Sequence, residues 1–210
     1  MKIEQHMKIA IIGTGNVGSA LAKGWSNAGH DILLGVRDQQ NFAGKKLLSM
    51  KNCTVHSIPE AVSLAEVILV SVPPKNILEV APLLKNVEEK IIIDPTNSFP
   101  APPSGYQNCF EAWSQTTNCQ HIVKAFNNTG YQNMLQPDGL DTFVAGNSEM
   151  AKKVAQKLAG DLGFSNCYDF GVGDKAGLLE QLAICWINMA YFQGLSTDFG
   201  FNIVRRPASN

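Results

Sequence analysis

The chain has 210 residues, of which 45% are hydrophobic, and its formal net charge is −1. This length is that of one ordinary domain, and the apolar fraction is enough for a full core. A balanced charge gives no sign of binding to nucleic acid or to a membrane surface. We therefore expect one domain over residues 1–210, with a small-molecule substrate and with no nucleic-acid or membrane partner.

The five cysteines predict a reducing environment, and the N-terminal residues show no signal-peptide pattern. The cysteines are odd in number and form no Cys-x-x-Cys pair and no cluster with histidine at metal spacing. They predict free thiols, no metal site and a cytoplasmic location. Residues 1–6 are polar and directly precede the first strand, so we interpret them as a loose extension, not a signal peptide.

Strand and helix patterns alternate along the first half of the chain. Short continuous apolar runs predict buried strands, and apolar residues spaced by three and four predict helices. In chain order the expected elements are a strand at 8–12, a helix at 17–28, a strand at 31–36, a helix at 39–50, a weak strand at 53–56, a helix at 59–65, a strand at 66–72, a helix around 77–84 and a strand at 91–94. This alternation predicts a parallel sheet with helices on both faces.

A proline-rich loop breaks this rhythm after residue 97, and the second half then continues it. The expected elements there are a short helix around Phe110 and Trp113, strands at 121–126 and 141–145, a helix from the N-cap Ser148 to about 161, an edge strand at 167–169 and a C-terminal helix at 174–193. The expected fold class is α/β, a Rossmann-like, doubly wound, mainly parallel sheet with a C-terminal helix.

A glycine motif joins the first strand to the first helix and predicts dinucleotide binding. It consists of Gly13, Thr14, Gly15, Asn16, Val17 and Gly18. In such a motif the first glycine allows the tight turn, the second lets the backbone approach a pyrophosphate, and the third lets the helix pack on the sheet. The helix N-terminus offers free N–H groups and a positive dipole end to the phosphates.

The end of the second strand predicts which dinucleotide binds. An acidic residue there would bind the ribose hydroxyls of NAD, whereas an arginine favours the 2′-phosphate of NADP. Val36 and Arg37 occupy this position, and Arg37 can form a forked pair with a phosphate. Asp38 follows and would repel that phosphate. We predict a preference for NADP, with a solvent-exposed Arg37–Asp38 pair as the alternative.

With these pieces placed, the chain resembles the NADP-dependent oxidoreductases that act on the deazaflavin coenzyme F420. It is also similar to the cytoplasmic reductase domain of membrane ferric reductases, which the same family includes. The stretches that carry the resemblance are 12–18 with Leu21 and Ala22, 29–30, 35–38, 71–73, 94–97, 123–127, 178–180 and 186–188. The resemblance covers nearly all of the chain and implies hydride transfer between NADP(H) and F420 or a flavin.

Two departures from the family pattern weaken the expected NADP preference. The archetypal enzymes carry Ser-Arg-Arg at the end of the second strand and a lysine three residues further on. Here Val36 replaces the serine, Asp38 replaces the second arginine and Asn41 stands at the lysine position. Only Arg37 remains to hold the 2′-phosphate.

The remaining candidate site residues follow later strands of the sheet. A Rossmann sheet binds its ligand beyond the carboxyl ends of the strands. We expect Ser71, Val72 and Pro73 to run past the nicotinamide ribose. Four further residues are expected to flank the nicotinamide, and they are Asn97, Ala125, Phe126 and Asn127. Asparagine suits a carboxamide because it offers both a donor and an acceptor, although either asparagine could instead be a turn residue.

The sequence offers no convincing acid–base pair, so no catalytic side chain is predicted. Lys124 lies on a strand and could point either way, and His56 and His121 look local. Hydride transfer to a stacked flavin or deazaflavin needs alignment more than a side-chain acid. We therefore predict an NADPH-dependent oxidoreductase with a deazaflavin or flavin acceptor. The alternatives are a non-catalytic NADP-binding sensor or partner-binding protein and a reductase of small carbonyls or imines.

The C-terminal helix carries an apolar stripe whose role the sequence leaves open. The residues that recur at helical spacing are Leu178, Leu182, Cys185, Trp186 and Met189. They could pack on the helix's own sheet. Alternatively, the aromatic end of this helix could cover the acceptor site or meet a second subunit, which would make the protein a homodimer.

Overall fold

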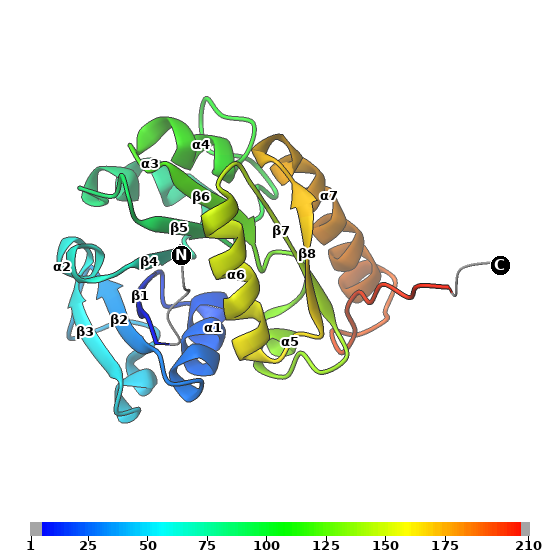
Figure 1. Ribbon diagram of the computed structural model, residues 1–210, viewed down its shortest axis with the longest axis horizontal. Helices are drawn as coiled ribbons and strands as arrows, with labels where there is room; N and C mark the ends of the chain where they lie inside the picture. The colour runs from blue at the N-terminus through cyan, green and yellow to red at the C-terminus, as the bar shows by residue number, and fades with distance from the viewer. Residues whose placement is uncertain (1–5, 207–210) are drawn as a thin grey trace.

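The computed structural model describes residues 6–206, so most of the extension predicted at 1–6 lies outside the described residues. Eight strands in this part of the chain form a single sheet (Figure 1). The strands are β1 (Lys8–Ile12), β2 (Asp31–Val36), β3 (Cys53–Ser57), β4 (Val67–Val70), β5 (Ile91–Asp94), β6 (His121–Ala125), β7 (Asp141–Gly146) and β8 (Asn166–Gly171).

The order of the strands creates the place where a ligand binds. The sheet runs β3-β2-β1-β4-β5-β6-β7-β8, and neighbouring strands are parallel except for β6 and β7. From β1 the chain first builds toward β3 and then crosses to β4 on the other side. In such sheets the ligand binds at this switch point, beyond the carboxyl ends of β1 and β4. The predicted doubly wound, mainly parallel fold is confirmed.

The described residues contain seven α-helices, of which α1 to α6 lie between strands and α7 follows β8. They are α1 (Asn16–Asn27), α2 (Ile58–Leu64), α3 (Ile77–Val80), α4 (Cys109–Thr116), α5 (Tyr131–Leu135), α6 (Glu149–Leu162) and α7 (Ala176–Ile187). Short 3-10 turns lie at Lys45–Ser49, Pro74–Asn76, Ala81–Leu83 and Gly173–Lys175, and a π-helical turn at Asn188–Phe192 extends α7.

The helices cover both faces of the sheet, so its inner strands are buried on both sides, whereas the edge strands β3 and β8 are partly exposed. Figure 1 shows α1 and α6 side by side across one face. Along β1, Ile9 and Ile11 point into the core beneath these two helices, whereas Ala10 and Ile12 point into a second core. That second core is closed by α2, α3 and α4, while α7 packs over β7 through Leu179. This double burial explains why the strands read as continuous apolar runs.

Three connections differ from the sequence prediction. The helix expected at 39–50 is reduced to the 3-10 turn at Lys45–Ser49, because the Asp38 carboxylate accepts hydrogen bonds from the backbone of Gln40 and Asn41 and holds a turn instead. The helix expected at 77–84 is broken into short turns around Pro82. The five-residue α5 was missed, since it is too short to show a helical period.

Candidate cofactor and acceptor site

The turn after β1 is built by two glycines that the protein's own packing requires. Gly13 has a φ of +98°, and a Cβ there would lie 2.2 Å from the carbonyl oxygen of Ser71. A Cβ on Gly18 would lie 1.9 Å from the carbonyl oxygen of Gly13. Strand β1, the loop after β4 and helix α1 therefore approach more closely than any larger residue permits.

Gly15 is different, because no atom beyond its chain neighbours and its own helix backbone lies within 4 Å of the position where its Cβ would be. It is the N-cap of α1, and no side chain caps this helix. The first-turn N–H groups therefore face an open space beside a backbone that carries no side chain. This cradle fits a pyrophosphate, which would accept from these N–H groups and interact with the helix dipole.

A cleft of about 390 Å³ extends from this cradle toward the end of β2. It brings together eight of the predicted site residues, which are Gly13, Thr14, Gly15, Val36, Arg37, Ser71, Val72 and Pro73. The Arg37 side chain is 68% exposed, and its guanidinium pairs with the Glu79 carboxylate at 3.1 Å. An adenosine with a 2′-phosphate fits this arm of the cleft, with Arg37 as its cationic partner.

A second cleft of about 340 Å³ lies on the other side of the loop after β4. It shares Ser71, Val72 and Pro73 with the first cleft. Three further predicted site residues, Asn16, Val17 and Asn97, line it, and none of its described lining residues is titratable. A dinucleotide spanning both clefts would place its nicotinamide here.

Asn97 and Asn127 form a pair of side chains behind this second cleft. The Asn127 amide nitrogen donates to Asn97 Oδ1 at 2.9 Å and to the Leu179 carbonyl at 3.1 Å, and Asn97 Nδ2 donates to the Asn127 carbonyl at 3.0 Å. Asn127 is only 3% exposed, so of these two side chains only that of Asn97 lines the cleft.

The other two residues expected beside the nicotinamide have side chains that line neither cleft. Ala125 and Phe126 are fully buried. Phe126 has a φ of 65°, and this left-handed turn directs its ring into the core, where it packs against Trp25 and Phe164. Only the backbone of this segment can therefore act near the site.

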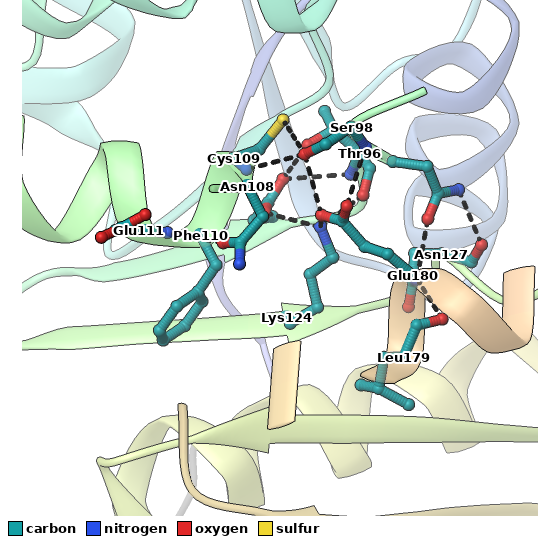
Figure 2. A network of polar contacts seen from close by, with 12 residues as sticks. Thr96, Ser98, Asn108, Cys109, Phe110, Glu111, Lys124, Asn127, Leu179 and Glu180 are labelled. Carbon is teal, nitrogen blue, oxygen red and sulfur yellow. Dashed lines mark hydrogen bonds and ion pairs between the residues drawn. The ribbon is translucent and has the colours of Figure 1, made fainter. Parts of the chain in front are cut away.

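The sequence did not predict a buried charge network beneath the second cleft (Figure 2). The Lys124 ammonium contacts Asp94 Oδ2 at 3.0 Å and Glu180 Oε1 at 2.5 Å, and Lys124 and Asp94 have no exposed side-chain surface. Burial alone would lower the pKa of Lys124, but the charges of Asp94 and then Glu180 raise it above its usual value. The signal was present in the sequence, since each of these charged residues interrupts or ends an apolar run, and a buried charge needs a partner.

Comparisons with known proteins agree with this geometry. Residues 8–98 match the family described as NADP oxidoreductase, coenzyme F420-dependent. The chain is 26% identical to the F420-dependent NADP reductase of Methanothermobacter thermautotrophicus, over 87% of this chain and 89% of that protein. Over most of its length the chain is therefore similar to an F420-dependent NADP reductase. The predicted resemblance is thereby confirmed.

Solved structures show how widely this fold is shared. A crystal structure of a proposed F420-dependent NADP reductase from Arthrobacter sp. FB24 matches with a TM-score of 0.84 at 24% identity, over 95% of this chain and all of that one. An imine reductase from Myxococcus stipitatus matches with a TM-score of 0.67 at 16% identity, over 93% of this chain but 64% of that one. Because both identities are below 25%, these two comparisons support the fold and nothing more specific.

The remaining histidines and the buried Cys109 thiol of the protein lie outside the two clefts. His56 pairs with Glu60 at 3.1 Å, and His121 contacts the Ser148 hydroxyl at 2.9 Å. Burial and then Asp94 raise the pKa of the Cys109 thiol to about 11, so this thiol stays protonated at neutral pH. Within residues 6–206 there is no group of three potential metal ligands, and no helix combines the length and apolar character needed to cross a membrane.

Proposed function

We propose that this protein transfers a hydride between NADP(H) and a deazaflavin of the F420 type, with a flavin as the other ring system that the same chemistry would serve. The observation that carries this proposal is the pair of connected clefts at the switch point of the sheet. One has an uncapped helix N-terminus and an arginine, and the other has no titratable side chain in its described lining. This favours an acceptor whose own ring carries the chemistry.

The residues of this chain would bind and orient the cofactor. Gly15 and the first turn of α1 would hold the pyrophosphate, and Arg37 would hold the 2′-phosphate. The loop Ser71–Pro73 would separate the adenosine arm from the nicotinamide arm, since it lines both clefts. Asn97, fixed by Asn127, would hydrogen-bond the nicotinamide carboxamide and so fix which ring face meets the acceptor.

A screen of acceptors under NADPH oxidation tests this proposal. Deazaflavin, FMN, ferric chelates, small carbonyls and cyclic imines are supplied separately, and turnover is followed by loss of NADPH absorbance. We expect the highest kcat/KM with the deazaflavin. Turnover confined to carbonyls or imines would instead assign a reductase of those substrates. Tight NADPH binding with no turnover on any acceptor would assign an NADP sensor.

We also propose that the protein is a cytoplasmic homodimer. The thiols of all five cysteines are free, as a reducing compartment would keep them. Near the end of α7, Trp186 is buried against Phe199. In the π-helical turn that follows, Tyr191 and Phe192 are 60% and 70% exposed. A second copy would cover these two rings. Light scattering should give twice the chain mass, and Phe192→Lys should shift it toward the monomer while Lys153→Glu, a control on α6, should not.

A further inference from the structure

The network of Lys124, Asp94 and Glu180 is completely hydrogen-bonded. The three ammonium protons of Lys124 meet Asp94 Oδ2 at 3.0 Å, Glu180 Oε1 at 2.5 Å and the Thr96 carbonyl oxygen at 2.5 Å. Asp94 Oδ1 also accepts from the Thr96 backbone N–H at 3.0 Å and from the Thr96 hydroxyl. Glu180 also accepts from the Ser98 backbone N–H at 2.9 Å and from the Ser98 hydroxyl at 3.2 Å.

This pattern fixes the charge of the network. Every partner of the two carboxylates can donate a hydrogen bond, and neither carboxylate faces an acceptor that would require a carboxyl proton. Two carboxylates and one ammonium leave one excess negative charge. Asp94 and Lys124 are fully buried and Glu180 is 6% exposed, so solvent and salt screen this charge far less than a surface charge.

The excess charge lies directly behind the wall of the second cleft. Thr96 lines that cleft, and its own backbone and hydroxyl make the contacts with Asp94 and Lys124. Figure 2 shows Glu180 on α7 reaching toward Lys124 and Ser98, beside Asn127. No titratable side chain in the described lining of the cleft offsets this charge.

We propose that the buried Lys124–Asp94–Glu180 network tunes the cofactor electrostatically by stabilising its oxidised form. This inference rests on the function proposed above. The nicotinamide ring is neutral in NADPH and positively charged in NADP+. In the reducing direction the hydrogen at C4 leaves with its electron pair to the acceptor, the acceptor ring takes one proton from solvent, and the nicotinamide gains a positive charge. A fixed negative charge behind the ring favours that change without touching the reacting atoms.

The network also fastens α7 to the loop after β5, and this purely mechanical role makes a different prediction. Loss of a mechanical support would weaken NADP+ and NADPH alike, because both forms share the same phosphates and carboxamide. Loss of a charge effect would weaken NADP+ relative to NADPH. The ratio Kd(NADP+)/Kd(NADPH) therefore separates the two roles.

The test measures both dissociation constants by calorimetry in the full-length protein and in Glu180→Gln, which keeps the shape of the side chain and removes the excess charge. A unit charge about 10 Å away in an effective dielectric of about 20–40 changes a binding constant roughly four- to fifteenfold. We expect Kd(NADP+)/Kd(NADPH) to rise by that factor. A tenfold rise corresponds to a bound-cofactor potential about 30 mV more positive.

Two further variants test whether the change in the ratio comes from the charge of the network. Asp94→Asn removes the same charge from the other carboxylate and should change the ratio in the same direction. Asp161→Asn is the matched control, because Asp161 is a partly buried carboxylate paired with Lys157 at 2.5 Å and His30 at 3.0 Å, remote from both clefts. Its ratio should match that of the unmutated protein. Thermal unfolding shows which variants remain folded.

The unmutated protein supplies a readout that needs no variant, since its ratio should lie below one. A ratio above one, or an equal loss of both affinities in Glu180→Gln, would overturn the electrostatic role and leave the proposed function standing. Failure of the unmutated protein to bind either form would instead overturn the proposed function, and the inference with it.

Discussion

Removal of the Arg37 guanidinium should convert an NADP-preferring protein into one that treats the two cofactors alike. A charge-assisted hydrogen bond to the 2′-phosphate contributes about 1.5–3 kcal/mol. In the free protein Arg37 already pairs with Glu79 at 3.1 Å. That pair is exposed, so breaking it costs at most about 1 kcal/mol. The difference, about 0.5–3 kcal/mol, predicts that Arg37→Ala weakens NADPH binding roughly two- to hundredfold.

The assay is a titration of NADPH and NADH at one fixed ionic strength, because exposed charges are screened by salt. NADH lacks the 2′-phosphate, so Arg37→Ala should leave its affinity nearly unchanged. Glu79→Gln is the matched control, and it should strengthen NADPH by up to about fivefold, since Arg37 then has no competing partner. Equal affinities of the unmutated protein for NADPH and NADH would refute the reasoning, and so would an equal loss of both in Arg37→Ala.

Three further substitutions probe the rest of the site. Gly15→Ala should keep the melting temperature and lose most NADPH affinity, because its Cβ meets no protein atom but would enter the pyrophosphate cradle; unchanged affinity would place the phosphates elsewhere. Asp38→Arg should strengthen NADPH binding by adding a second cation near the 2′-phosphate, and an unchanged affinity by calorimetry would place the phosphate away from the end of β2. Asn97→Ala should lower kcat at least tenfold with little change in NADPH affinity, as expected of a residue that aligns the carboxamide; a loss confined to affinity would contradict that role.

The sequence predicted those parts of the fold whose signal is local. Strands such as 31–36 and 91–94 were found because a buried parallel strand is a short apolar run. The cap at Ser148 was found because the chemistry of an N-cap depends on neighbouring residues. The glycine motif belongs to this class as well, since its turn, cradle and helix contact lie within six residues.

The parts that were missed depend on distant segments. Glu180 and Lys124 are 56 residues apart, and no spacing rule brings a carboxylate on a C-terminal helix to a lysine in a central strand. Phe126 was expected at the site because it follows β6, but its backbone turns left-handed and sends the ring into the core between Trp25 and Phe164. Tertiary packing decides which residues meet in both cases. An apolar run interrupted by a charge indicates that the charge is buried, but it does not identify the partner.

The central claim is direct hydride transfer from the nicotinamide to the acceptor ring, and isotope transfer tests it most directly. NADPH deuterated at C4, prepared as each of the two stereoisomers, is oxidised by the protein with a deazaflavin acceptor, whose reduced C5–H bond does not exchange with water. We predict that the deuterium of one stereoisomer appears quantitatively on the reduced deazaflavin and that the other stereoisomer transfers none. Appearance of the label in water, or transfer from both stereoisomers, would contradict a single aligned hydride transfer in the second cleft.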